Sequence, residues 1–268
     1  MPQSHSAVAC TSNGALPEAA HITVRGLYKD FGGTVVYAGF DLDIPRGRFI
    51  TVFGPNGCGK STLINIIAGL IPLDRGRILF GGKGLAQTKI GYVFQNYREA
   101  LFPWMSAFAN IAYRCGRCAW PGERADRVER LLAHLGASID LKLYPYQMSG
   151  GQQQLVSILR ALVVEPEVLF LDEPFSALDY EMSLFMRDSL QRIFAETKTT
   201  TVLVSHDLEE AVDLAAYVLL LSRRPARVAD YRRVALPRPR GDAILADPAF
   251  IEQKRHCLEV FQREVRAK

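Results

Sequence analysis

The sequence lacks the long apolar runs and paired cysteines that mark membrane-spanning or disulfide-bonded chains. No apolar stretch reaches the roughly 18–20 residues that a membrane-spanning helix needs. The longest, residues 50–53 and 215–221, have the length of buried strands. The first 20 residues lack the basic and apolar regions of a secretory signal, so we expect a flexible leader over residues 1–20. The odd count of five cysteines in a chain of 268 residues favours reduced thiols in a soluble cytosolic protein.

Charge of one sign is not in large excess either. The chain carries 32 Lys and Arg against 28 Asp and Glu, a formal charge of +4, and 49% of its residues are hydrophobic. Such a composition excludes global disorder and allows a sizeable core in one large domain or two small ones. Residues 222–268 hold 12 basic and 6 acidic side chains, whereas residues 1–221 hold 20 and 22. We therefore expect a nearly neutral body followed by a basic C-terminal segment.

Buried strands alternate with helices along most of the chain. Residues 21–27 and 40–44 alternate apolar and polar side chains, as half-buried antiparallel strands do. The rest predicts an α/β fold with a mainly parallel sheet that helices cover on both faces. Further strands are expected at residues 48–53, 77–80, 90–94, 168–171, 200–204 and 217–221, and helices at 61–70, 151–164 and 181–196. Residues 101–165 have a helical pattern that interrupts the alternation, which indicates an inserted helical subdomain.

A glycine-rich loop follows the strand expected at residues 48–53 and precedes a helix. It matches the pattern G-x-x-x-x-G-K-[ST] with Gly54, Pro55, Asn56, Gly57, Cys58, Gly59, Lys60, Ser61 and Thr62. In such a loop, successive backbone N–H groups converge on phosphate oxygens, and the helix N-terminus adds the positive end of its dipole. Lys60 would bridge the β- and γ-phosphates, and the Ser61 hydroxyl would bind Mg²⁺. The pattern and its context favour a nucleotide-binding loop over an ordinary glycine-rich turn.

Two carboxylates follow the apolar strand expected at residues 168–171. Asp172 and Glu173 would stand at the carboxyl end of a parallel strand, where ligands bind in open α/β sheets. Asp172 would hold Mg²⁺ directly or through water, and Glu173 would orient and polarise an attacking water. An apolar run that ends in Asp-Glu says little alone, but together with the phosphate loop it indicates nucleotide hydrolysis.

A second anion cradle is expected at the start of the helix near residue 151. It consists of Ser149, Gly150, Gly151 and Gln152, and it would offer a phosphate the N–H groups and dipole of a helix N-terminus. One nucleotide needs only one phosphate loop, so a second cradle suggests a site that another subunit completes. The alternative is an N-terminal helix cap with a glycine pair.

The order of these motifs resembles the ATP-hydrolysing subunit of ABC transporters over about residues 21–240. In Met148-Ser-Gly-Gly-Gln152 we find the family's signature motif, with Met where Leu is usual. The resemblance implies that Phe31 stacks on adenine, Gln95 is the Q-loop glutamine and contacts Mg²⁺, Asp179 belongs to the D-loop, and His206 is the switch histidine. Taken alone, Gln95 could be a loop amide, His206 a surface histidine, and Phe31 a core residue.

The resemblance also implies a fold, a cofactor and an assembly. The fold would be a P-loop NTPase of the ABC ATPase type, with an antiparallel β subdomain, over residues 21–240, and a C-terminal helical extension would follow at 241–268. Two chains would pair head-to-tail as a homodimer around two ATP molecules with Mg²⁺. Lys60, Glu173 and His206 would be catalytic, and the signature residues would contact the nucleotide of the other subunit.

The membrane partner is indicated by a loop after Gln95. Residues 101–104, Leu-Phe-Pro-Trp, would expose an apolar patch where the family receives its transmembrane permease subunits. With Asn110 and the Pro-Arg-Pro-Arg run that ends at Arg240, this patch resembles the nitrate/sulfonate/taurine importer branch. The resemblance implies a peripheral protein on the cytoplasmic face of the inner membrane that serves a periplasmic or extracellular solute-binding protein. Nitrate, sulfonates, taurine and related organic solutes all remain open.

Two further patterns offer alternatives. Seven arginines of the basic segment could form a phosphate-binding patch of a soluble ABC-type ATPase that acts on nucleic acid or ribosomes. They are Arg223, Arg224, Arg227, Arg232, Arg233, Arg238 and Arg240. Few aromatics lie between them, so no nucleic-acid partner is expected. Cys115 and Cys118 form a C-x-x-C pair with His134 as the one nearby further ligand, so a metal or redox role is not expected. The C-terminal helix at 248–265 would pack through Phe250, Leu258, Phe261 and Val265.

Overall fold

The computed structural model describes residues 18–115, 121–176, 178–238 and 240–266. Among them, six strands form a sheet in the spatial order β5-β6-β7-β3-β8-β9, in which only β9 runs antiparallel to its neighbour. These strands are β5 (Ile90–Val93), β6 (Val168–Asp172), β7 (Thr200–Val204), β3 (Phe49–Phe53), β8 (Tyr217–Leu221) and β9 (Val228–Arg233). The predicted, mainly parallel sheet is confirmed, with one antiparallel edge strand that the sequence reading did not include.

An antiparallel sheet lies beside it, in the order β2-β1-β4. Its strands are β1 (Ala20–Phe31), β2 (Thr34–Pro45) and β4 (Arg75–Phe80). The first two are longer than the short strands predicted at residues 21–27 and 40–44. They extend toward each other because a tight turn at Gly32 and Gly33, both with positive φ, closes the hairpin.

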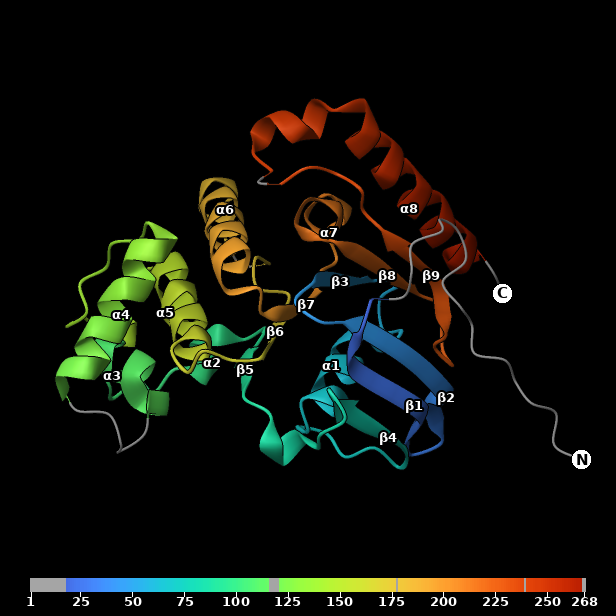
Figure 1. The fold of residues 1–268 in the computed structure, drawn as a ribbon, viewed down its shortest axis with the longest axis horizontal. Coiled ribbons are helices and arrows are strands. Elements are labelled where there is room, and N and C mark those ends of the chain that lie inside the picture. The colour runs from blue at the N-terminus through green and yellow to red at the C-terminus, as the bar shows by residue number, and fades with distance from the viewer. Residues whose placement is uncertain (1–17, 116–120, 177, 239, 267–268) are drawn as a thin grey trace, which may run out of the picture.

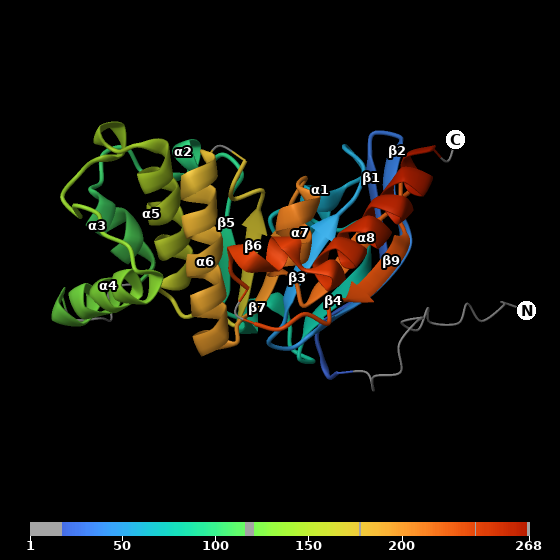
Figure 2. The ribbon, with the colours of Figure 1, turned by 90° about the horizontal axis from the view of Figure 1, so that it is seen from above.

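Helices cover both faces of the parallel sheet (Figure 1). They are α1 (Lys60–Ile67), α2 (Tyr97–Ala100), α3 (Ala107–Ala112), α4 (Pro121–Leu135), α5 (Gly150–Leu162), α6 (Tyr180–Thr197), α7 (Leu208–Leu214) and α8 (Pro248–Arg266). Figure 1 shows α2 to α5 grouped at one end of the molecule beyond β5, and α8 along β8 and β9 at the other. Seen from above, α5 and α6 lie side by side (Figure 2).

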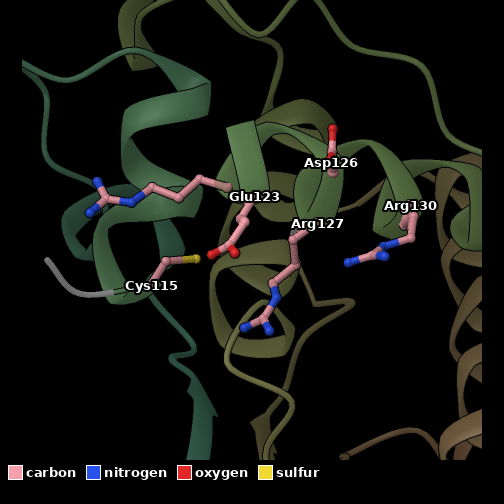
Figure 3. A pocket seen from close by; sticks show the side chains of 6 residues that line it. Cys115, Glu123, Asp126, Arg127 and Arg130 are labelled. Carbon is pink, nitrogen blue, oxygen red and sulfur yellow. The ribbon is translucent and has the colours of Figure 1, made fainter. Parts of the chain in front are cut away.

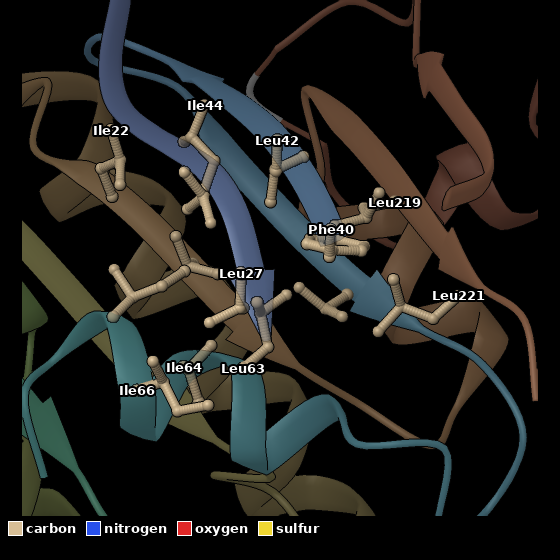
Figure 4. Packing of buried hydrophobic residues seen from close by; sticks show 14 of the residues in the cluster. Ile22, Leu27, Phe40, Leu42, Ile44, Leu63, Ile64, Ile66, Leu219 and Leu221 are labelled. Atoms are coloured by element: carbon tan, nitrogen blue, oxygen red, sulfur yellow. The ribbon is translucent and has the colours of Figure 1, made fainter. Parts of the chain in front are cut away.

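The core divides according to the alternation of side chains along the strands. Ile50 and Val52 of β3 point to one face and belong to a cluster with residues of α1 and the antiparallel sheet. Figure 4 shows part of this cluster, with Leu63 and Ile64 of α1 near Leu27 of β1. Phe49 of the same strand joins a second cluster with α5 and α6, while Phe53 joins a third with α7 and α8. The strand is buried on both faces, which explains its continuous apolar sequence.

The helix α8 packs through a face that overlaps the predicted one but excludes Leu258. Phe250 is buried and Phe261 packs against Phe53 with ring centroids 5.1 Å apart, as expected, but Leu258 is 43% exposed. Cys257 and Val260 are buried in its place. No helix in the described part of the chain is both long enough and apolar enough to span a bilayer.

Candidate active site

The glycine-rich loop connects β3 to α1 in a conformation that requires glycine. Gly54 and Gly59 have φ of +156° and +122°. A Cβ atom at Gly54 would lie 2.8 Å from the backbone oxygen of Leu221, and one at Gly59 would lie 2.6 Å from Cγ1 of Val36. At Gly57, with φ of +72°, a Cβ would meet no atom within 4 Å. This loop is therefore a backbone cradle packed tightly against β2 and β8, and its tip is open.

Lys60 closes the cradle from the first turn of α1. Its Nζ donates to the carbonyl oxygens of Gly54 at 2.9 Å and Pro55 at 3.2 Å, and the residue is buried. Tyr37 of β2 supports the loop from below, because its hydroxyl donates to the carbonyl of Gly59 at 2.9 Å. Burial raises the pKa of Tyr37 well above its usual value, so the hydroxyl stays a donor. The sequence reading missed Tyr37, since its strand offers no motif that points to the loop.

The other loop residues differ in exposure. Asn56 and Gly57 are exposed, Thr62 is half-buried, and Cys58 is buried. Burial raises the pKa of the Cys58 thiol, which disfavours the reactive thiolate.

Ser61 and Asp172 meet across the site. The Ser61 hydroxyl donates to Oδ1 of Asp172 at 2.8 Å, although the two residues are 111 positions apart. Burial, and to a smaller extent the neighbouring Glu173, raises the pKa of Asp172, while the hydrogen bond from Ser61 lowers it. The hydroxyl and the carboxylate are hard oxygen ligands, and Mg²⁺ commonly binds one or two such protein groups together with phosphate and water. This donor set fits Mg²⁺.

Glu173 gathers side chains from three neighbouring strand ends. Its Oε2 accepts a hydrogen bond from Nε2 of Gln95, after β5, at 2.9 Å, and Nδ1 of His206, after β7, lies 3.2 Å from the same oxygen. Glu173 itself follows β6 with φ of +45°, a conformation uncommon for a non-glycine residue. Its N–H donates to the carbonyl of Val204 at 3.0 Å, which fixes the residue at the sheet's carboxyl edge. The three residues named from the motifs are thus in direct contact.

The second cradle, at Ser149, Gly150 and Gly151, forms a capped helix N-terminus that lies apart from the glycine-rich loop. Ser149 caps α5: its Oγ accepts from the N–H of Gln152 at 3.3 Å, and its own N–H donates to Oε1 of Gln152 at 2.9 Å. A Cβ at Gly150 would lie 2.9 Å from the Tyr97 hydroxyl, and one at Gly151 would lie 2.9 Å from Cγ of Met182. Figure 1 shows α5 with the helices beyond β5, whereas α1 lies on the other side of that strand. The fold of one chain does not bring the two cradles together.

Asp179 and Phe31 lie at two further places. Asp179 is the N-terminal cap of α6, and its Oδ1 accepts from the N–H of Met182 at 2.8 Å. Phe31 ends β1 and is 46% exposed, with the Lys29 ammonium 5.0 Å from its ring centroid. The core interpretation of Phe31 is therefore wrong, because nearly half of the side chain is exposed.

Gln154 links α5 to the segment after Glu173. The side chain is fully buried, and its Nε2 donates to the carbonyl of Pro174 at 2.6 Å. Its residue type and its place two positions after Gln152 were visible in the sequence, but nothing there indicated the distant partner.

A pocket in the helical end of the molecule is separate from this site. It is lined by Cys115, Glu123, Arg124, Asp126, Arg127 and Arg130. Figure 3 shows the Cys115 sulfur and the Glu123 carboxylate pointing toward each other. Cys118 lies outside the described residues, and His134 pairs with Glu196 at 3.4 Å. In the described part of the chain, no cluster of three or more His, Cys, Asp or Glu could hold a metal ion.

Comparison with known proteins gives one family. Residues 37–176 match the family described as "ABC transporter". The taurine import ATP-binding protein of Escherichia coli is 37% identical over 257 residues, which cover 90% of this chain and 98% of that protein. The sulfate/thiosulfate import ATP-binding protein of Xylella fastidiosa is 42% identical over 212 residues, 75% of this chain. This chain spans only 60% of the length of the Xylella relative.

Solved structures agree with the fold. A dimeric bacterial ABC transporter cassette superposes with a TM-score of 0.71 and 28% identity, over 81% of this chain and all of that one. A subunit of a Clostridium perfringens ABC transporter complex superposes with a TM-score of 0.73 and 26% identity, over 90% and 97%. The fold class predicted from the motifs is confirmed.

Proposed function

Since this chain belongs to the ABC transporter family, we propose that it is the ATP-binding and ATP-hydrolysing subunit that powers a solute importer. The contact of Glu173 with Gln95 and His206, at the sheet edge that also carries Asp172, is the observation on which this proposal chiefly rests. A carboxylate there can polarise a water for attack on a phosphoryl group bound at the glycine-rich loop. The names of the import ATP-binding relatives from Xylella fastidiosa and Escherichia coli support the same function.

Each residue of the proposed site has a separate role in ATP hydrolysis. The loop N–H groups and Lys60 bind the phosphates, and the positive charge of Lys60 offsets negative charge that develops on the γ-phosphoryl group. Ser61 and Asp172 would hold Mg²⁺, with Gln95 nearby, and the ion would supply further neutralisation of the phosphates when bound. Glu173 orients the attacking water, His206 contacts the γ-phosphate, and Phe31 stacks on the adenine.

We propose a head-to-tail homodimer because one chain holds only half of each nucleotide site. The cradle at Ser149, Gly150 and Gly151 has the N–H groups and helix dipole of an anion site, yet it lies apart from the loop of its own chain. A second copy would bring it onto the γ-phosphate, with Asp179 near the same interface. A relative with a similar fold is described as a dimer, which supports this assembly.

A membrane partner is supported by an exposed aromatic surface, formed by Phe102, Trp104 and Tyr113. Trp104 is 70% exposed, and the ring centroid of Phe102 lies 5.6 Å from that of Trp104 and 4.8 Å from that of Tyr113. The buried Asn110 holds this loop, since its amide donates to the carbonyls of Phe102, Met105 and Ser106. Leu101 is buried, so the prediction that it is exposed is wrong. We propose that permease subunits dock on this aromatic surface.

We assign the solute to the class that the relatives' names suggest, a small oxyanion or sulfonate such as sulfate, thiosulfate or taurine. The protein would act at the cytoplasmic face of the inner membrane, and a solute-binding protein would deliver the solute to the permease. Residues 1–20, 21–240 and 241–268 would be a leader, the ATPase domain with its helical subdomain at 101–165, and a C-terminal extension.

The nucleic-acid alternative is not favoured, because many arginines of the basic segment bind the protein's own backbone. Arg240 is buried and donates to the carbonyls of Val212, Asp213 and Ala215 at 2.6–2.9 Å. Arg238 donates to the carbonyl of Leu214. Arg238 and Arg240 are therefore not available to a phosphate-binding patch, since they satisfy the carbonyl end of α7.

Replacement of Glu173 by Gln tests the function. The amide keeps the size of the side chain but cannot accept a proton, so ATP hydrolysis should fall by at least about 100-fold. Equilibrium binding of ATP should persist, and size-exclusion chromatography should show an ATP-stabilised dimer. Lys60→Ala is the matched control, because it should weaken ATP binding itself. Wild-type hydrolysis by Glu173→Gln would exclude the role assigned to this carboxylate.

A further inference from the structure

The short segment that carries His206 is fixed from within the protein, although His206 itself is not. The His206 side chain is 54% exposed, and its Nδ1 lies 3.2 Å from Oε2 of Glu173. The preceding residue, Ser205, is 1% exposed, and its N–H donates to the carbonyl of Val52 in β3 at 3.3 Å. The buried neighbour therefore anchors the backbone from which the histidine extends.

The Ser205 hydroxyl connects both sides of this segment. It donates to Oε2 of Glu210, in the first turn of α7, at 2.7 Å, and it accepts from the N–H of Asp207 at 3.0 Å. Asp207 in turn caps α7, since its Oδ1 accepts from the N–H groups of Glu209 and Glu210 at 2.7 and 3.2 Å. These hydrogen bonds close a ring around His206 that runs through Ser205, Asp207 and Glu210.

Glu210 is half-buried and lies in a charged environment. The pKa of Glu210 is raised, chiefly by burial and also by the neighbouring Asp207. The hydrogen bond from Ser205 and the positive charges of Arg187 of α6, itself 4% exposed, and His206 oppose this shift. Its neighbour Glu209 instead pairs with Lys254 of α8 at 3.2 Å, so the two adjacent glutamates have different partners. A half-buried carboxylate with a short contact to one hydroxyl can fix that hydroxyl's position.

We propose that Ser205 and Glu210 are positioning residues that hold His206 in place for the γ-phosphate of bound ATP. The inference rests on the proposed function, because it gives His206 that target. Without the Glu210 carboxylate, the Ser205 hydroxyl keeps only the longer contact, to the carbonyl of Asp207 at 3.2 Å, which lies in the same turn. The hydroxyl then no longer ties this turn to α7, and the turn that carries His206 can rotate. A displacement of about 1 Å at a reacting group can reduce the rate by up to about 100-fold.

The test compares Glu210→Ala with Glu210→Gln and with Glu209→Ala, in the full chain. Glu210→Ala should lower kcat for ATP hydrolysis by about 10-fold or more, and KM for ATP should change by less than about 2-fold, because the phosphate loop is untouched. Glu210→Gln should restore most of kcat, since its amide oxygen still accepts from Ser205. Glu209→Ala, on the same turn, should hydrolyse ATP as the wild type does.

A double substitution separates positioning from a general loss of structure. In a His206→Ala background, Glu210→Ala should have no further effect on kcat, because the side chain that it positions is gone. An equal further loss in that background would overturn the proposal, as would wild-type kcat in Glu210→Ala or a Glu210→Gln variant as slow as Glu210→Ala. His206→Ala and Glu173→Gln are measured in the same assay. If both hydrolyse ATP normally, the proposed function fails; if both lose activity while Glu210→Ala does not, only the positioning role fails.

Discussion

The glycines of the phosphate loop differ in whether the structure has room for a Cβ atom, and alanine substitutions can measure this difference. At Gly59, a Cβ would approach Val36 to 2.6 Å and the Tyr37 hydroxyl to 3.0 Å at a φ of +122°. We expect Gly59→Ala to shift the loop and to weaken ATP binding by about 10-fold or more, since the shift breaks the convergence of N–H groups. Equilibrium binding of a fluorescent ATP analogue measures the effect.

Gly57→Ala is the matched control for this prediction. Its Cβ would meet no atom within 4 Å, so only the left-handed backbone at φ of +72° opposes the change, at a cost of about 1–2 kcal/mol. If Gly59→Ala bound the analogue as tightly as Gly57→Ala does, the close approach to Val36 would have no functional importance.

The raised pKa of Asp213 predicts that the stability of the protein depends on pH. Burial raises its pKa to about 6, against the lowering influence of Arg187 and Arg240. Because the folded state then binds the proton more tightly than the unfolded state, this group's contribution to stability falls as pH rises from about 4 to about 6. Relative to Asp213→Asn, which does not titrate, the wild type should lose up to about 3 kcal/mol over that range. Urea unfolding at several pH values measures the difference, and a constant difference would contradict the raised pKa.

At the residue scale, the sequence predicted which residues form the site but not which distant residues support them. Lys60, Asp172, Glu173 and His206 belong to motifs, and a motif reports its own position along the chain. Tyr37 supports the loop from a distant strand, so its contribution depends on tertiary packing that no local pattern contains. The same limit explains why the sequence reading did not link Gln154 to Pro174.

Among the secondary-structure elements, α7 depends most on a distant residue. The helix ends at Leu214, and the buried Arg240 guanidinium donates to three carbonyls near that end. We expect Arg240→Ala to lower the free energy of unfolding by about 2–4 kcal/mol, because it leaves buried carbonyls without donors. Chemical denaturation measures this loss.

Arg233→Ala removes the same charge from an exposed position on β9 and serves as the control. It should change stability by less than about 0.5 kcal/mol. Equal losses in the two variants would show that net charge matters rather than the capping of α7.

The positions of helices and strands along the chain were predicted more accurately than the side through which a helix packs. The parallel strands are mostly apolar and buried along their length, so their positions could be predicted directly from the sequence. In α8, however, polar Gln253, Lys254 and Glu264 share the packing side with Cys257 and Val260, so the apolar pattern misled the choice of Leu258. The seven arginines of the basic segment show a related limit of the sequence. Arginines that bind carbonyls inside the protein have the same sequence pattern as arginines that face solvent.

For the whole molecule, the aromatic surface predicts separate effects on catalysis and assembly. We expect Trp104→Asp to leave ATP hydrolysis by the isolated chain unchanged, because Trp104 does not contact the site residues. Co-purification with the permease subunits should be lost, since a charge would be buried at the interface. Affinity purification of the complex from membranes measures the second effect.

Ile251→Asp, on the outer side of α8 and 52% exposed in the wild type, is the control for a new surface charge elsewhere. It should assemble normally. Normal assembly of Trp104→Asp would exclude the aromatic surface as the docking site.

The overall fold and family could be inferred from the order of motifs, and the second cradle already suggested a site that another subunit completes. What the sequence did not predict is where the two cradles lie: in one chain the signature cradle and the phosphate loop lie apart, and in the proposed homodimer a second copy would unite them. Sequence spacing carries no information on that separation, because it is produced by the placement of α5 beyond β5.

The two contacts at Oε2 of Glu173 join this carboxylate to both ends of the molecule. Nε2 of Gln95 donates to the oxygen at 2.9 Å, and Nδ1 of His206 lies 3.2 Å from it. Gln95 leads into α2 and the aromatic surface, while His206 leads into α7, which packs against α8. A displacement at either end of the molecule can therefore reach the proposed catalytic carboxylate through a single side chain.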